Sequence, residues 1–189
     1  MKLTKTRFNY WAEFVIDIPL GWALIITGLR ISEYKFLAVL LTILLGMFLF
    51  SFFEYAIHRW LFHGSVRILA QGHQAHHDDP MAYLAQPFFL PALILLALAS
   101  VFFLLMPPNY SLILTGTVAL SYTTYGLSHF IIHHHRFHFI PARNWAALHH
   151  IHHYHADTNF GVTTPLWDLL IGTRYRYVGV KGGVDRKND

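Results

Sequence analysis

Long runs of apolar residues constrain the fold of this chain more than any other feature. Phe36–Ile57 is a run of 22 residues with a single acid, Glu54, near its end, and Phe88–Met106 is a run of 19 residues without a charge. At 1.5 Å per helical residue these runs reach about 33 and 28 Å, and the hydrocarbon core of a bilayer is roughly 30 Å thick. Both runs therefore predict membrane-spanning helices.

Two further runs are interrupted by polar residues. Tyr110–Ile132 has 23 residues with polar groups near its end, so its last turn is expected to face protein or water. Phe14–Leu29 contains Asp17 and Pro19, and we interpret it as an uncleaved anchor or a tilted span because a poor cleavage site follows it. The two prolines within Met106–Asn109 predict a tight connection and an antiparallel hairpin.

Four spans would place both termini on one side of the membrane, together with the polar segments His58–Pro87 and His133–Asp189. Of the 14 Lys and Arg residues, 12 fall on that side and only Arg30 and Lys35 on the other. The positive-inside rule predicts that the side with 12 Lys and Arg residues is cytoplasmic. We therefore expect an all-α integral membrane protein with about four transmembrane helices and a cytoplasmic helical cap, forming a single domain over residues 1–189 with a mobile tail at 181–189.

Composition narrows the possible chemistry. Charged residues make up only 13% of the chain, which argues against a soluble domain, and the net charge of +4 fits an anionic membrane surface without any nucleic-acid partner. Cysteine is absent, which excludes disulfides, thiolate metal sites and cysteine nucleophiles. The 15 histidines outnumber the 10 acids. Histidine is therefore the residue type in which we expect the function to lie.

Ten histidines occur in four clusters at spacings that suit metal binding. Because a helix turns by about 100° per residue, residues at i, i+3 and i+4 share a face, and each triplet could hold one ion from a single helix. His58 and His63 differ, since they lie about 140° apart on an ideal helix. They would share an ion only if the helix ends or bulges between them, and otherwise they serve two ions. The ten candidates are His58, His63, His73, His76, His77, His129, His133, His149, His152 and His153.

Ten nitrogen ligands exceed what one ion takes, so the pattern predicts a centre of two ions. A bridging water or hydroxide, or a nearby carboxylate, is expected to complete the shell. The available acids are Glu54, Asp78 and Asp79, and each is interpreted as a partner of a ligand or a helix-end charge rather than as a direct ligand. The remaining histidines in these segments are expected to be hydrogen-bonded core or interface residues: His134, His135, His138, His150 and His155.

The order of the clusters, His-x4-His, His-x2-His-His, His-x3-His and His-x2-His-His among four spans, resembles the membrane fatty acid hydroxylase superfamily, which includes sterol desaturases and carotenoid hydroxylases. Two segments are similar to fatty acid 2-hydroxylases in particular. They are His-His-Asp-Asp-Pro-Met at His76–Met81 and Phe-Gly-Val-Thr-Thr-Pro-Leu-Trp-Asp at Phe160–Asp168, the latter followed by Gly172-Thr173. The resemblance covers roughly Phe36–Thr173.

The resemblance implies an oxygenase with a di-metal site on the cytoplasmic face, which inserts one atom of O2 at C2 of a fatty acid or a sphingolipid acyl chain. The family's ligands fall on the same ten histidines. Oxidation of an unactivated C–H bond requires a redox metal, so we expect two iron ions, although purified protein could contain zinc. Electrons would come from a separate cytochrome b5-like or ferredoxin/reductase protein, since the 35 residues before Phe36 are too few for a fused cytochrome b5 domain. Such a donor is expected near Arg174 and Arg176.

Some residues depart from the 2-hydroxylase pattern. The segment Met81–Gln86 lacks the acidic and basic residues of those enzymes, and a third motif built from His133 or His134 with His138 would resemble carotenoid hydroxylases. A sterol, carotenoid or alkyl-lipid hydroxylase or desaturase is therefore an alternative. Trp60, Trp145, Tyr154 and Trp167 are expected to be interfacial anchors or pocket walls.

Proteins of other classes are weaker alternatives. A non-catalytic zinc-binding membrane protein or a metal transporter would also carry many histidines, but transport requires ionisable residues along the bilayer midplane. The runs Phe36–Ile57 and Phe88–Met106 offer none there. A bis-histidine haem protein needs paired histidines on facing helices, without the triplets.

Overall fold

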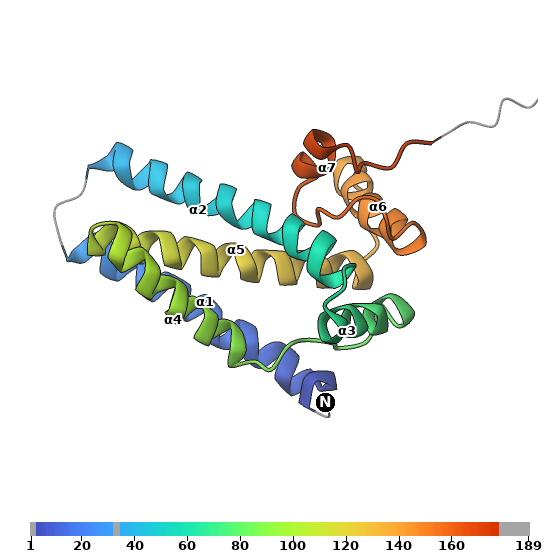
Figure 1. Cartoon of the computed structure of the whole chain (residues 1–189), viewed down its shortest axis with the longest axis horizontal. Helices are drawn as coiled ribbons and strands as arrows, with labels where there is room; N and C mark the ends of the chain where they lie inside the picture. The colour runs from blue at the N-terminus through green and yellow to red at the C-terminus, as the bar shows by residue number, and fades with distance from the viewer. Residues whose placement is uncertain (1–2, 32–34, 178–189) are drawn as a thin grey trace, which may run out of the picture.

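The computed structural model describes residues 3–31 and 35–177, so the expected tail at 181–189 lies outside the described residues. The described chain is all-helical, without a strand (Figure 1). Its elements are a 3-10 turn at Leu3–Lys5, α1 (Arg7–Arg30), α2 (Phe36–Ala56), a π-helical segment at Ile57–Phe62, α3 (Arg67–Asp78), α4 (Leu90–Leu105), α5 (Pro108–His134), α6 (Ile140–Tyr154) and α7 (Leu166–Ile171).

Helix α5 is the centre of the bundle and packs against α1, α2 and α4. Its contact with α1 is close because glycines face each other across the interface. A Cβ atom added to Gly116 would lie 2.6 Å from the carbonyl oxygen of Gly21, and one added to Gly28 would lie 2.6 Å from the carbonyl oxygen of Asn109. The backbones of the two antiparallel helices therefore touch, and only glycine fits at these positions.

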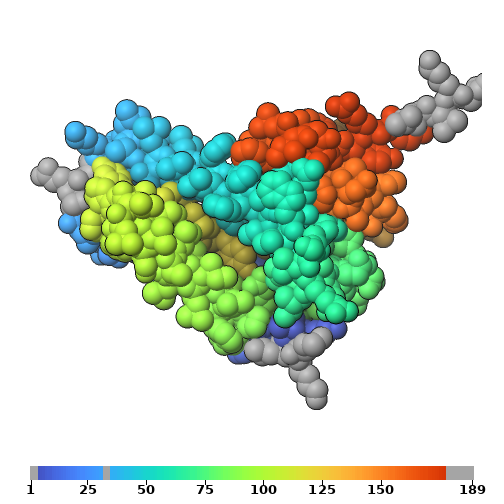
Figure 2. All heavy atoms as spheres, in the orientation of Figure 1, coloured from blue at the N-terminus to red at the C-terminus, as the bar shows by residue number. Residues whose placement is uncertain are grey.

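The bundle buries polar side chains and exposes apolar ones. Thr115 and Thr117 on α5 are buried, and their hydroxyls donate to the carbonyls four residues earlier at 2.9 and 2.8 Å. Leu41 on α2 is 56% exposed and Leu104 on α4 is 86% exposed. In Figure 2, α2 and α4 form the outer surface on the left, and α5 is visible only in the hollow between them. This distribution is typical of helices packed within a membrane.

The expected spans are confirmed in part. Two described helices are long and apolar enough to cross a membrane: α1, and α2 together with the π-helical segment to Phe62. Helix α1 contains the whole interrupted run Phe14–Leu29 without a break at Pro19. Helix α4 is apolar but has only 16 residues, and α5 carries the buried threonines. The crossing of the membrane by α4 and α5 stays a prediction.

Short connections position the remaining helices. Helices α4 and α5 are joined by Met106 and Pro107 alone and form the expected hairpin. The segment before α4 is tied to α1, because the Asn9 side chain donates to the carbonyl of Gln86 at 2.6 Å and accepts from the amide of Phe88 at 3.0 Å. Helices α3, α6 and α7 gather at the end of the bundle where α2 and α5 finish (Figure 1). The histidine clusters are therefore brought to one end.

Candidate metal centre

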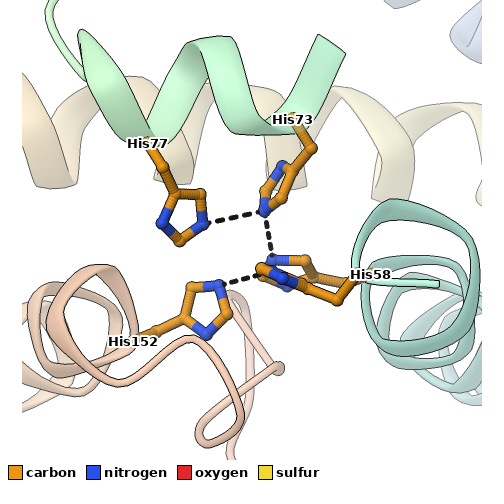
Figure 3. A group of neighbouring side chains, drawn as sticks. His58, His73, His77 and His152 are labelled. Atoms are coloured by element: carbon orange, nitrogen blue, oxygen red, sulfur yellow. Dashed lines mark hydrogen bonds between the residues drawn. The ribbon is translucent and has the colours of Figure 1, made fainter. Parts of the chain in front are cut away.

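The ten candidate histidines lie in two groups of five, and in each group one ring nitrogen per residue lies within 4.8 Å of the others. The first group comprises His58, His63, His73, His77 and His152. The second group comprises His76, His129, His133, His149 and His153. Figure 3 shows four members of the first group, with their rings directed toward one another from the end of α2, from α3 and from α6. Taken together, the two groups contain ten histidines from four segments that are distant in the sequence.

Each histidine triplet is divided between the two groups. On α3, His73 and His77 belong to the first group and His76 to the second, whereas on α6, His152 belongs to the first group. The expectation that one triplet holds one ion is therefore wrong. On an ideal helix the residue at i+3 lies about 60° to one side of residue i, and the residue at i+4 lies about 40° to the other side. The histidines of each helix are therefore divided between two neighbouring faces, and each face contributes to one group.

The pair His58 and His63 belongs to one group because the helix between them widens. The amide of His63 donates to the carbonyl of His58 at 3.2 Å, an i to i+5 hydrogen bond that closes the π-helical segment Ile57–Phe62. A π-helical turn places residue i+5 above residue i, and such turns are frequent at functional sites. Of the arrangements that the spacing left open, the structure has the bulge, and the two rings lie in the same group.

The ring nitrogens of the first group have the spacing of ligands around one ion. The Nε2 atom of His73 lies 3.0 Å from the Nε2 atoms of both His58 and His77 (Figure 3). The Nε2 atoms of His63 and His152 are also 3.0 Å apart. Metal–nitrogen bonds to histidine are about 2.0–2.1 Å long, so two nitrogens at right angles around one ion lie about 3.0 Å apart. The geometry fits a single cation.

Backbone carbonyls determine the tautomer of two ligand candidates in the first group. The Nδ1 atom of His58 lies 2.5 Å from the carbonyl oxygen of Phe160, and that of His152 lies 2.7 Å from the carbonyl oxygen of Thr158. Because a carbonyl oxygen only accepts, both Nδ1 atoms carry the proton and donate. The Nε2 lone pairs of these two rings are then free to point into the group and to bind a cation.

The second group fits a cation as well. The Nε2 atom of His149 lies 3.0 Å from that of His133 and 3.2 Å from that of His153. The Nε2 atom of His76 is buried and has no hydrogen-bond partner among the described residues. A buried nitrogen without a partner carries a free-energy cost, and a cation held by the five rings would remove it. Imidazole nitrogen suits both iron and zinc.

Burial keeps these imidazoles neutral. It lowers the pKa of His63 to about 4 and the pKa values of His76 and His152 to about 3. A charged neighbour adds to the effect, since protonation of His77 would disfavour protonation of His63. Only a neutral imidazole has a lone pair for a metal. Both groups are therefore ready to bind cations at neutral pH without losing protons.

The nearby acids lie outside both groups. Glu54 accepts hydrogen bonds from the amides of Val162 and Thr163 at 2.6 and 2.8 Å, and from the Thr163 hydroxyl. It therefore fastens α2 to the segment before α7. Asp78 and Asp79 are exposed, and Asp78 accepts from the side chain of Gln74 at 2.9 Å. The interpretation that these acids are not direct ligands agrees with their positions.

Asp168 is a residue of the site whose role the sequence did not reveal. It is 1% exposed, and its carboxylate accepts from the amides of Phe160 and Gly161 at 2.8 Å each. The carbonyl of Phe160 in turn accepts from His58. The available signal was an acid in the first turn of the apolar helix Leu166–Ile171, but its partners lie outside that helix.

The five other histidines lie outside both groups. His134 stacks on Phe130 with ring centroids 3.9 Å apart, and His155 stacks on Tyr175 at 4.7 Å. His135, His138 and His150 are exposed. The alternative third motif through His134 and His138 therefore has no counterpart in either group.

The four aromatic residues that were expected to be interfacial anchors or pocket walls fall into two classes: two are exposed, and two donate hydrogen bonds to neighbouring segments. Trp60 is 52% exposed and Tyr154 is 86% exposed. Trp145 donates to the carbonyl of Val162 at 2.7 Å, and Trp167 donates to the hydroxyl of Ser51 at 3.1 Å. These last two fasten α6 and α7 to neighbouring segments.

Two open hollows reach the first group at His63. They have volumes of about 560 and 680 Å³, and both are lined by His63, Gly64 and Ser65. Arg67 lines the smaller hollow, and Arg59 lines the larger. His63 is therefore the ligand candidate that solvent or another molecule can approach from these sides.

Comparisons with known proteins agree with this geometry. Residues 43–173 match the family model described as fatty acid hydroxylase. The chain is 28% identical over 177 residues to dihydroceramide fatty acyl 2-hydroxylase FAH1 of Arabidopsis thaliana, covering 87% of this chain and 73% of that protein. It is 28% identical over 186 residues to fatty acid 2-hydroxylase of Rattus norvegicus, covering 90% of this chain and 46% of that protein. The solved structure of full-length scs7p, in which only the hydroxylase domain is visible, matches with a TM-score of 0.79 and 26% identity over 93% of this chain and 69% of that one.

Proposed function

The chain belongs to the fatty acid hydroxylase family, and we propose that it hydroxylates C2 of a lipid acyl chain, either of a fatty acid or of a sphingolipid. The relatives named as dihydroceramide and fatty acid 2-hydroxylases support this substrate class. The observation that carries the proposal is the convergence of ten imidazoles in two groups of five at one end of the helical bundle. The reaction makes the protein an oxidoreductase.

We propose that the ten histidines bind two iron ions. Hydroxylation of an unactivated C–H bond requires a metal that changes oxidation state, and zinc does not. When bound, the pair of iron ions supplies the activation of O2. The residues of the chain contribute neutral imidazoles and fixed tautomers at His58 and His152. His58, His149 and His152 are buried, whereas His63 borders the open hollows. Zinc could occupy the same positions in purified protein, since imidazole does not discriminate strongly between the two metals.

The proposed topology has four membrane crossings, with both termini and the metal centre on the cytoplasmic side. Helices α1 and α2 are long and apolar enough to cross a membrane, and α4 and α5 form a hairpin beside them. Arg30 and Lys35 lie at the turn between α1 and α2, whereas the other described Lys and Arg residues belong to segments at the histidine end. The positive-inside rule then favours a cytoplasmic centre.

The polar end of the substrate must lie close to the reacting carbon, because C2 is bonded directly to the carbonyl carbon. The larger hollow beside His63 is lined by Arg59, Trp60 and Asp157, so it combines hydrogen-bonding groups with an aromatic surface. These groups are suited to an amide or hydroxyl head group. This supports oxidation near the head group rather than in the middle of the acyl chain.

Two electrons per turnover are required from a donor protein of the cytochrome b5-like or ferredoxin/reductase class. Arg174 and Arg176 are exposed at the end of the described chain. A basic surface favours an acidic partner, chiefly by raising the rate of encounter. We propose that the donor docks there, on the same side as the metal centre.

The experiment is expression of the full chain in a host that lacks 2-hydroxy lipids, followed by mass spectrometry of hydrolysed acyl chains. Iron-loaded wild type is expected to yield 2-hydroxy acids, whereas His73→Ala and His152→Ala yield none. Absence of the product from wild type with bound iron and added reductant would contradict the substrate assignment. A hydroxylated product from supplied sterols or carotenoids would assign the enzyme to another branch of the family. Metal flux in proteoliposomes without O2 consumption would favour a transporter.

A further inference from the structure

Two rings of the first group donate hydrogen bonds to the backbone carbonyls of one short loop. The carbonyl of Thr158 accepts from His152 and the carbonyl of Phe160 accepts from His58, at 2.7 and 2.5 Å. The two rings come from different helices, α6 and the π-helical segment after α2. The loop Thr158–Thr163 therefore orients one ligand candidate from each side of the first group.

Two buried carboxylates hold this loop in place. Asp168 accepts the amides of Phe160 and Gly161, and Glu54 accepts the amides of Val162 and Thr163. Four consecutive N–H groups of the loop thus donate to two carboxylates. A Cβ atom on Gly161 would lie 2.1 Å from the carbonyl oxygen of Thr164, so the loop takes this path only with glycine there.

A chain of donors supports the carboxylate of Asp168. The Thr173 hydroxyl donates to Asp168 at 2.7 Å and accepts from the Tyr55 hydroxyl at 3.0 Å. Arg59 donates to the Tyr55 oxygen at 2.9 Å. Because all these groups are donors directed toward Asp168, its carboxylate is fixed, and with it the Phe160 carbonyl that faces His58.

The second group lacks this support from the protein. The Nδ1 atoms of His149 and His153 are buried without a hydrogen-bond acceptor among the described residues. No described backbone carbonyl therefore sets the tautomer of these two rings. The two groups have the same number and type of side chains but differ in what orients them.

We propose that the two cation positions are unequal: the first group binds a divalent cation more tightly than the second, and Asp168 is the positioning residue that produces the difference through the Phe160 carbonyl. The inference rests on the proposed di-metal function. A hydrogen bond from the distal ring nitrogen fixes the tautomer and orientation of a histidine and raises its basicity, and its loss costs about 10–100-fold in metal affinity.

The test is titration of the full-length, metal-free protein in detergent with Co²⁺, whose visible spectrum reports binding, in competition with a chelator. Two binding steps are expected in wild type. His73→Ala should abolish the tighter step, and His133→Ala the weaker. Asp168→Asn should weaken the tighter step by about 10–100-fold and leave the weaker step unchanged. Asp79→Asn, which changes an exposed acid at the end of α3, is the matched control and should alter neither step.

Thr173→Val provides a milder variant in case Asp168→Asn does not fold, because it removes only one of the three hydrogen bonds to Asp168. It should weaken the same tighter step by a smaller factor. Equal affinities in wild type, or an equal loss in both steps for Asp168→Asn or Thr173→Val, would overturn the inference. Unequal steps without a 2-hydroxy product would contradict only the proposed substrate, whereas protein that binds no Co²⁺ would contradict both proposals.

Discussion

His76 and His152 each belong to a different group from the other clustered histidines on their own helix. His76 lies on α3 with two members of the first group but belongs to the second. His152 lies on α6 with two members of the second group but belongs to the first. Helices α3 and α6 therefore contribute to both groups. Neither group is complete unless both helices are in place, so formation of the two sites is expected to be coupled to docking of both helices.

This division predicts that neighbouring histidines on α3 serve different ions. His73→Ala and His76→Ala each remove one imidazole from the same helix, but from different groups. Each variant should lose one of the two ions and retain the other after a chelator wash, as measured by elemental analysis. If both variants lose the same ion, with identical spectra of the retained Co²⁺, the division into two groups is wrong. His150→Ala, on the exposed side of α6, should retain both ions.

The stability of the metal-free protein should fall as the pH falls. Burial lowers the pKa of His63 to about 4 and the pKa values of His76 and His152 to about 3, from an ordinary value of 6.5. Below 6.5 the unfolded chain binds more protons than the folded chain, so the free energy of unfolding decreases with decreasing pH. The loss should begin near pH 6.5 and continue toward pH 3.

Thermal unfolding of the metal-free protein at pH 7.5 and pH 5 measures this effect. A lower melting temperature at pH 5 is expected. Bound metal should be retained by the folded protein at both values, because imidazoles whose pKa values are about 3 to 4 remain neutral at pH 5. An unchanged or higher melting temperature at pH 5 would contradict this expectation.

Much of this site follows from local periodicity, and the rest depends on long-range packing. The ten histidines are recognisable because their spacings place them on common helix faces. The helical angle alone indicates that His58 and His63 share an ion only where the helix ends or bulges between them. The division of each triplet could not be predicted, because it depends on where α3 and α6 lie relative to each other. The roles of Glu54 and Asp168 were also hidden, since Glu54 contacts residues 108 and 109 positions away.

Prediction of the fold from the sequence has the same limit as prediction of the site. The apolar runs predict α2 and α4, and the prolines at Met106–Asn109 predict the hairpin. The interruption of Phe14–Leu29 by Asp17 weakens the sequence signal for α1, yet the helix continues through Asp17, whose side chain is fully buried within the bundle. Hydropathy measures apolar character and does not report which helices pack against each other.

Glu54 should contribute to stability rather than to metal binding. Glu54→Ala leaves the buried amides of Val162 and Thr163 without an acceptor, and each unsatisfied buried group costs about 1–3 kcal/mol. A reduced free energy of unfolding in detergent is therefore expected, with a smaller loss for Glu54→Gln, which retains an acceptor oxygen. A change in metal stoichiometry in folded Glu54→Gln, without loss of stability, would instead assign Glu54 to the metal shell.

The close approach of α1 and α5 can be tested with a matched pair of glycines. The Cβ of Gly116→Ala would lie 2.6 Å from the carbonyl oxygen of Gly21, whereas Gly72 on α3 has no atom within 4 Å of an added Cβ. Overpacking of this kind costs typically about 1–3 kcal/mol. Gly72→Ala should instead be neutral or stabilise α3 by about 0.5–1 kcal/mol. Equal effects of the two substitutions on unfolding would show that the two helices are not in backbone contact.

The most direct test of the metal centre is the iron content of full-length protein purified without oxygen from iron-supplemented cells. The account predicts two iron ions per chain in wild type and none when representatives of both groups are removed together, as in His73→Ala combined with His133→Ala. A folded wild-type protein that contains a single ion, or that contains no metal after reconstitution with excess Fe²⁺, would contradict the central claim that two groups of five imidazoles each bind one cation.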